Sequence, residues 1–213
     1  KDDKSKLSFD NFSYVGYFPT ANESGIMSWN IGLSYNRLKN FNRNYRLSGS
    51  QAYSLADYAA DISYGIHEND LIYVKDSYDP YNNPNNPWMS VLGYEAGYFG
   101  SFLNDRSSYH SGFGTSNATG DIWYADSPQN TTLNVSEKGA VDQYNFAFAT
   151  NISNSVFLGA TIAVTDINYS ISTIYDERFA GSDYLYLDNG LTTEGTGYSF
   201  NLGAIVRPVD FLR

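Results

Sequence analysis

The chain has 213 residues, a formal net charge of −10, 42% hydrophobic and 17% aromatic residues, and no cysteine. This composition suffices for one domain with a sizeable core, and it excludes a disulfide framework, a cysteine-ligated zinc site and a thiol nucleophile. The negative charge argues against a basic surface for nucleic acid, and no apolar run reaches the roughly 18 residues that predict a transmembrane helix.

Two strands are predicted near the start of the chain. Residues 7–18 alternate in character with one slip of register, and a short turn follows at 19–25. The next stretch, 25–38, keeps the alternation for about ten residues, which is the period of a β-strand with one apolar face. Its large residues are Met27, Trp29, Ile31, Leu33 and Tyr35, separated by Ser, Asn and Gly.

The middle of the chain, residues 39–140, is predicted to be a long surface-loop region. Within it, 51–66 has apolar residues at helical spacing, and Ser54 followed by Asp57 fits a capping box. The stretch 87–102 fits a strand or a helix. Residues 104–130 are expected to be loop, with one short strand at "DIWYA" (121–125).

The strand pattern returns in the last third. Residues 141–150, 156–171 and 197–207 alternate, with short connections at 151–155 and around Pro208. The polar stretch 172–196 is expected to be a second long loop, and 211–213 to begin a further strand.

Three features favour lipid over a protein layer as the cover of the apolar faces. The intervening residues are small and nearly free of charge, the strands are long enough for a tilted membrane crossing, and short connections alternate with long ones. We therefore expect a mainly all-β fold, an antiparallel meander that forms part of a transmembrane β-barrel, with one or two short helices in extracellular loops and residues 1–213 as a single β-rich domain. Five or six spanning strands are predicted, whereas closed barrels start at eight, so we expect a segment of a larger barrel.

Several segments resemble the FadL-type family of outer-membrane channels for long-chain fatty acids and other hydrophobic compounds. They are "VDQYNFAFATNISNSVFLGATIAVTDINYS", "GTGYSFNLGAIVRPVDFLR", "LSFDNFSYVGYFP" and "SLADYAADISYGI". The resemblance implies a barrel plugged by an N-terminal hatch, ligand capture on an apolar loop groove, and location in the outer membrane of a Gram-negative bacterium. The hatch and the later strands of the family have no counterpart in this sequence, so we expect it to carry part of the ligand groove.

Two apolar clusters in the loop region are the candidate ligand-binding residues, because acyl chains need apolar contact more than hydrogen bonds. The alternative for each cluster is ordinary packing within the loop, since any packed helix has an apolar stripe. The candidates are Tyr53, Leu55, Tyr58 and Ile62 in the first cluster, and Trp88, Met89, Leu92, Tyr98, Phe99 and Phe102 in the second.

No catalytic, cofactor or metal site is predicted. His110 and Ser111 are adjacent, and adjacent strand residues point to opposite faces. Asp76 and Asp79 lack the spacing of a calcium loop. The expected partners are hydrophobic small molecules and outer-membrane lipid, with self-association through open sheet edges as a further expectation. The alternative to a channel is a soluble or surface-anchored β-sandwich that binds ligands through exposed aromatic residues.

Overall fold

The computed structural model describes residues 9–117 and 123–208, which divide into two compact units. The first, here called the sheet unit, comprises residues 9–44, 136–172 and 190–208. The second, the loop unit, comprises residues 45–117, 123–135 and 173–189. Because β8, β9 and β10 each have residues in both units, this division does not test the predicted single domain over 1–213.

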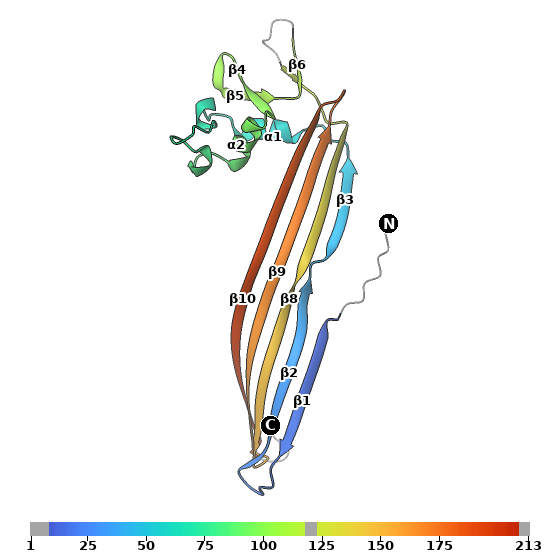
Figure 1. Ribbon diagram of the computed structural model, residues 1–213, viewed down its shortest axis with the longest axis vertical. Helices are drawn as coiled ribbons and strands as arrows, with labels where there is room; N and C mark the ends of the chain where they lie inside the picture. Colours follow the sequence, from blue (N-terminus) through green and yellow to red (C-terminus); the bar gives the residue numbers. More distant parts are fainter. Residues whose placement is uncertain (1–8, 118–122, 209–213) are drawn as a thin grey trace. The chain divides into compact units, whose positions relative to one another are not determined.

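The main sheet has six strands in the order β1-β2-β8-β9-β10, with β3 pairing with β8 off this path (Figure 1). Register is antiparallel where β1 meets β2 and where β2 meets β8. Within the described part of the chain β1 and β10 are not paired with each other, so the sheet is open. Its strands are β1 (Asn11–Pro19), β2 (Ile26–Asn40), β3 (Arg43–Gly49), β8 (Asn130–Ile152), β9 (Val156–Arg178) and β10 (Tyr184–Val206).

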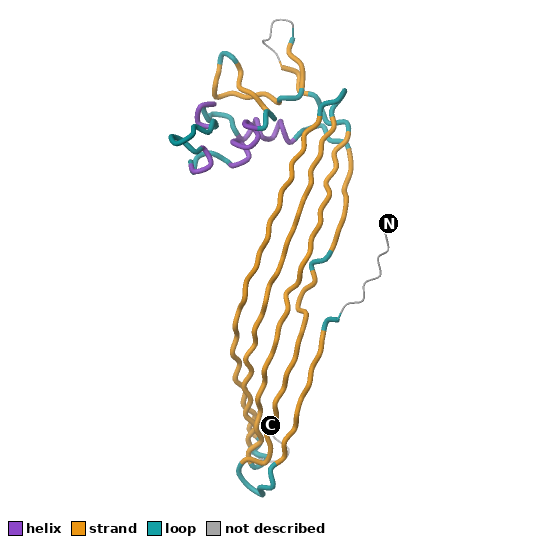
Figure 2. The backbone as a smooth tube through the Cα atoms, in the orientation of Figure 1, coloured by secondary structure: helices purple, strands orange, loops and turns teal. Residues whose placement is uncertain are grey.

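The loop unit contains the helices and two small antiparallel sheets (Figure 2). The first sheet pairs β4 with β5, and the second pairs β6 with β7. The elements are α1 (Leu55–Ile62), the short 3-10 turns η1 (Glu68–Asp70) and η2 (Pro80–Asn82), α2 (Trp88–Glu95), β4 (Phe99–Phe102), β5 (Asp105–Ser111), β6 (Gly114–Ser116) and β7 (Trp123–Ala125).

The prediction of a mainly β, antiparallel fold with two short helices is confirmed. The predicted capping box is also present: the Ser54 hydroxyl accepts from the Ala56 amide, and the Ser54 amide donates to the Asp57 carboxylate. This cap starts α1 at Leu55, four residues later than predicted, and the helix ends at Ile62, before Gly65, whose φ of 87° is left-handed.

Three segments differ from expectation. The predicted loop 172–196 is wrong, because β9 runs on to Arg178 and only 179–183 connect it to β10. A buried Leu185 between exposed tyrosines gives this polar stretch its alternation. The region 39–140 also contains β3 and the first part of β8, and its stretch 104–130, predicted to be loop with one short strand, contains β5 and β6 as well. The stretch 87–102 is both a helix, α2, and a strand, β4. The predicted strand at 211–213, the start of the strand at 7–8 and residues 121–122 of the short strand lie outside the described residues.

Candidate functional site

The register of β1, β2 and β8 sorts their side chains onto two faces. Tyr14 lies opposite Leu33, and Leu33 lies opposite Phe146. Directly paired residues share a face, and successive residues alternate between faces. One face therefore gathers large apolar side chains from all three strands: Phe12, Tyr14, Phe18, Trp29, Ile31, Leu33, Tyr35, Tyr144, Phe146 and Phe148.

Contacts between the later strands extend this face across the sheet. The Gln143 amide nitrogen donates to the Thr165 hydroxyl at 3.3 Å, so these two side chains share a face. Ile162 is three residues from Thr165, and Phe146 is three residues from Gln143, so both lie on the other face. The Thr196 hydroxyl donates to the Asp166 carboxylate, and the Arg207 backbone amide donates to the Ser155 carbonyl. Both contacts fit one antiparallel register of β9 with β10, and in that register Phe200 lies opposite Ile162.

Exposure on these faces is the reverse of that in a soluble sheet. On the apolar face, Leu33 is 43% exposed, Phe146 54% and Phe200 62%. On the opposite face, Ser28 is 3% exposed and Ala163 2%. A sheet that faces water normally presents polar residues outward and covers the apolar ones. An exposed apolar surface that crosses five strands marks contact with lipid or with another protein.

The five strands share a segment that contains no Asp, Glu, Lys, Arg or His. The segments are 11–19, 26–36, 143–152, 156–165 and 195–206, and we call them together the charge-free band. Each is about ten residues long, the length that a tilted strand needs to cross a hydrocarbon layer. At about 3.3 Å per residue and a tilt of about 40°, such a segment rises about 25 Å, the height of the apolar band of outer-membrane barrels.

The charge-free band ends on all five strands at one side. The first charged side chains beyond it are Asp10, Arg37, Asp142, Asp166 and Glu194. Arg37 and Asp142 lie opposite each other on the apolar face and form an ion pair of 2.9 Å. The Tyr35 hydroxyl donates to the same Asp142 carboxylate at 2.8 Å.

Aromatic residues mark both margins of the band. Tyr35 and Tyr144 lie opposite each other next to the ion pair, with ring centroids 5.4 Å apart. At the other margin the rings of Phe18 and Trp29 stack at 4.1 Å. Aromatic side chains at two levels that flank an apolar band are typical of both interfaces of a membrane barrel. From the sequence, Trp29, Tyr35 and Tyr14 are candidates for interface aromatic residues or for ordinary core, and the first charge after each alternating run locates the border.

The opposite face of the band, here called the small-polar face, carries uncharged side chains. The Asn145 amide donates to the Ser34 hydroxyl at 3.1 Å, and the Asn11 amide donates to the Asn36 carbonyl. Gly32 and Ala147 lie opposite each other in the next row of this face, on the other side of the Ser34–Asn145 row. Neighbouring amides and hydroxyls thus satisfy one another across strands.

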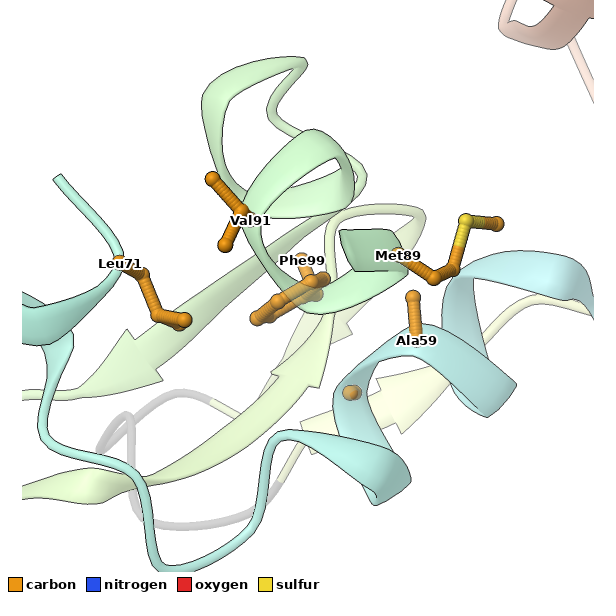
Figure 3. Packing of buried hydrophobic residues seen from close by; sticks show 6 residues of the cluster. Ala59, Leu71, Met89, Val91 and Phe99 are labelled. Carbon is orange, nitrogen blue, oxygen red and sulfur yellow. The ribbon is translucent and has the colours of Figure 1, made fainter. Parts of the chain in front are cut away.

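The loop unit brings several of the predicted ligand-binding residues into its own core. Met89 is 6% exposed and Phe99 3%, in a cluster with Ala59, Leu71 and Val91 (Figure 3). Leu55, Ile62 and Tyr98 are partly buried against this cluster. These five predicted residues pack against other residues of the loop unit, which is the alternative of ordinary loop packing.

The other predicted residues lie differently. Tyr53, Tyr58 and Trp88 are exposed, and the Tyr53 hydroxyl donates to Asp61, whose carboxylate raises the pKa of Tyr53 to about 12. Leu92 is half-buried on α2. Phe102 is half-buried and packs edge-on against His110, with ring centroids 5.0 Å apart.

A buried carboxylate joins the end of β9 to helix α1 within the loop unit. Glu177 is 0% exposed and accepts from the Ser54 hydroxyl at 2.5 Å, from the Leu55 amide at 3.1 Å and from the Tyr175 hydroxyl at 2.6 Å. A carboxylate at a helix N-terminus satisfies free amides and interacts favourably with the helix dipole. Burial raises the pKa of the neighbouring Asp57, and Glu177 contributes to that shift.

A second carboxylate organises the other side of the loop unit. Glu68 accepts from the hydroxyls of Ser101 and Tyr94 and pairs with Arg106 at 2.9 Å. The Ser101 hydrogen bond and then Arg106 hold the pKa of Glu68 below its ordinary value. These contacts connect η1 with α2, β4 and β5, so Glu68 acts as a structural tie.

The adjacent His110 and Ser111 do not form a nucleophile and base. The His110 Nδ1 lies 2.9 Å from the backbone carbonyl of Ser111, and the Ser111 hydroxyl, which is buried, accepts from the Phe113 amide. In the part of the chain that the structure describes, no three His, Cys, Asp or Glu side chains are placed to hold a metal ion. Within residues 9–117 and 123–208, no helix has the length and apolar character to cross a membrane.

The candidate site is therefore the charge-free band of the sheet, with its apolar face and its small-polar face. The loop unit is a separate compact unit. Comparisons with protein-family models, with curated proteins and with solved structures found no match to this chain.

Proposed function

We propose that β1, β2, β8, β9 and β10 form part of the wall of a transmembrane β-barrel in the outer membrane of a Gram-negative bacterium. The barrel is a non-enzymatic channel of the FadL type that admits long-chain fatty acids or other hydrophobic compounds by passive diffusion. The observation that carries this proposal is the exposed apolar face of the charge-free band, opposite a small-polar face that is partly or fully buried on β2, β8 and β9.

The energetics favour lipid as the cover of the apolar face. Each strand contributes about four large apolar side chains, and removing one from water gains about 1.5–3 kcal/mol. Water against this face would thus cost on the order of 6–12 kcal/mol per strand. Within the sheet unit, the described residues form strands of this one sheet and their connections, with no helix and no second sheet. Hydrocarbon satisfies the apolar face without such a layer.

The same arrangement accounts for passive transfer. The small-polar face would line the lumen, where side chains such as Ser34 and Gly32 leave room for a solute. Exposed aromatic residues of the loop unit, among them Tyr58 and Trp88, would offer apolar contact for capture. Neither step needs a nucleophile, a metal or a cofactor.

The barrel needs further strands, and strand direction limits their number. β1, β8 and β10 run in one direction and β2 and β9 in the other, so β1 and β10 would meet in parallel. A second copy inserted in the same orientation brings the same two edges together in parallel. An antiparallel barrel therefore requires an odd number of further strands between β10 and β1, which makes closure by self-association alone unfavourable.

Detergent dependence tests the proposal against a soluble β-sandwich. The purified chain is expected to need detergent or phospholipid to stay monodisperse in size-exclusion chromatography. A monodisperse species in plain buffer, with a circular dichroism spectrum of folded β-structure, would contradict the channel.

A further inference from the structure

The small-polar face carries no ionic group at any level of the charge-free band. Its residues on β2 and β8 are Ser28, Asn30, Gly32, Ser34, Asn36, Gln143, Asn145, Ala147, Ala149 and Asn151. On β9 the segment 156–165 is also free of charge, and so is 195–206 on β10. Pores that select ions use rings of charged side chains or of oriented backbone carbonyls. Within the charge-free band this wall has no charged side chain that would pair with a carboxylate in transit.

The hydrogen-bonding groups of this face are neutral, and neighbouring ones bond to each other across strands. Asn145 donates to Ser34, and Gln143 donates to Thr165. Amides and hydroxyls of this kind exchange partners with a solute that carries a hydroxyl or a carbonyl. For a bare carboxylate they replace its hydration incompletely, and an unpaired charge is costly to bring out of water.

Four guanidinium groups near the band and in the loop unit are engaged by the chain's own acids. Arg37 pairs with Asp142, Arg43 with Glu137, Arg106 with Glu68 and Arg178 with Asp176. The chain as a whole has a net charge of −10. An acidic surface lowers the local concentration of anions and leaves that of neutral molecules unchanged.

From these observations we infer that the solute class of this wall is uncharged: apolar molecules with a hydroxyl, carbonyl or amide group, in preference to fatty-acid anions. The inference rests on the proposed function, because it takes the small-polar face as the lumen wall. Of the two solute classes in that function, it selects other hydrophobic compounds over long-chain fatty acids.

The absence of native cysteine allows a direct test by single-cysteine labelling of the full chain in phospholipid vesicles. Ala149→Cys lies on the small-polar face, its neighbour Phe148→Cys lies on the apolar face, and Ala21→Cys lies in the exposed turn before β2. The probes are three methanethiosulfonates of similar size, one with a hydroxyethyl group, one with a sulfonate and one with a trimethylammonium group.

The neutral-to-anionic rate ratio at Ala149→Cys is expected to exceed that at Ala21→Cys about tenfold, because only the neutral probe passes a charge-free wall at low cost. Ratios equal at both positions, or a cationic probe that reacts faster than the neutral one, would overturn the inference. Adding Asn145→Lys to Ala149→Cys is expected to speed the anionic probe, whereas Asn145→Gln leaves its rate unchanged. An equal effect of the two substitutions also argues against the inference.

Failure of the proposed function has a different signature. If Phe148→Cys reacts with the charged probes as fast as Ala21→Cys, the apolar face is in water and the membrane assignment is wrong. This test uses only the labelling rates of Phe148→Cys and Ala21→Cys, so it does not depend on which probe reacts faster at Ala149→Cys.

Discussion

Arg37 and Asp142 lie directly opposite each other on β2 and β8, with 2.9 Å between the guanidinium Nε and the carboxylate Oδ1, at the point where the apolar face of the sheet ends. One pair further into the band, the same face carries Tyr35 and Tyr144. The order of ion pair, tyrosine pair and Leu33–Phe146 pair along one face fixes where the membrane boundary falls if the sheet is inserted.

A cation placed on the apolar face is expected to block insertion. Leu33→Lys lies inside the band, one pair from the tyrosine margin, and is expected to cost about 2 kcal/mol of folding free energy in phospholipid vesicles, because an ammonium group would face hydrocarbon. Urea titration of folding into vesicles, followed by tryptophan fluorescence, measures this cost.

The control for this variant is the adjacent residue. Ser34→Lys lies on the small-polar face, where water is expected, and its cost should stay below about 1 kcal/mol. Equal costs at positions 33 and 34 would mean that the two faces meet the same medium.

Gly139 is expected to be intolerant of substitution. Its φ is +119°, and a Cβ atom there would overlap the backbone carbonyl oxygen of Asn168 on β9. Gly139→Ala should therefore destabilise the pairing of β8 with β9 by more than about 2 kcal/mol, since the clash is with backbone. Equilibrium unfolding in urea provides the measurement.

Gly159→Ala serves as the matched variant, because the nearest atom to its Cβ is the Phe148 carbonyl oxygen at 3.7 Å, an ordinary contact. It should change stability by less than about 1 kcal/mol. A tolerated Gly139→Ala would show that the strand distorts there more readily than the backbone geometry indicates.

Glu177 is expected to hold helix α1 in the loop unit. Glu177→Ala removes the acceptor of the Ser54 hydroxyl, the Leu55 amide and the Tyr175 hydroxyl, and should destabilise α1 by about 3 kcal/mol. Amide hydrogen exchange of residues 55–62 should accelerate by about a hundredfold.

The neighbouring Asp176 provides the comparison. Its carboxylate accepts from the half-exposed Arg178 at 2.9 Å, and surface pairs of this kind contribute less than about 1 kcal/mol. Asp176→Ala should leave exchange in α1 nearly unchanged. Similar acceleration in both variants would mean that local charge, rather than the buried cap, stabilises the helix.

The stability of the loop unit is expected to fall in acid through Glu68. The Ser101 hydroxyl and Arg106 lower the pKa of this carboxyl in the folded state below its ordinary value of 4.5. A lowered folded pKa contributes stability that is complete above the ordinary value and is lost as the pH falls through the folded pKa. Hydrogen exchange of β4 and β5 between pH 6 and pH 3 should show this loss.

In Glu68→Gln the part of the pH dependence below 4.5 should be reduced, because the amide does not titrate. Asp76→Asn, on an exposed turn of the same unit, is the control and should keep the wild-type slope. An unchanged slope in Glu68→Gln would place the acid sensitivity elsewhere.

Local pattern was sufficient where a period or a cap decides the conformation. The alternation from Met27 to Tyr35 gave a strand with one apolar face, and Ser54 with Asp57 gave the start of a helix, since both depend only on residues close in sequence. The faces of β8 and the amino-terminal half of β9 followed in the same way. The polar stretch 172–196 failed because its alternation is carried by tyrosines and a single buried leucine, a weak signal beside its charges.

The amino-acid sequence by itself determined which side chains share a face and where charge is absent, because a strand has a period of two whatever it pairs with. Only the tertiary structure decided that β2 pairs with β8 across more than ninety intervening residues, that Arg37 meets Asp142, and that Met89 and Phe99 enter the core of the loop unit. Pairing between distant segments depends on register and on packing against partners that no local pattern specifies. The residues predicted for ligand contact were therefore divided between core and surface by contacts that lie far apart in the chain.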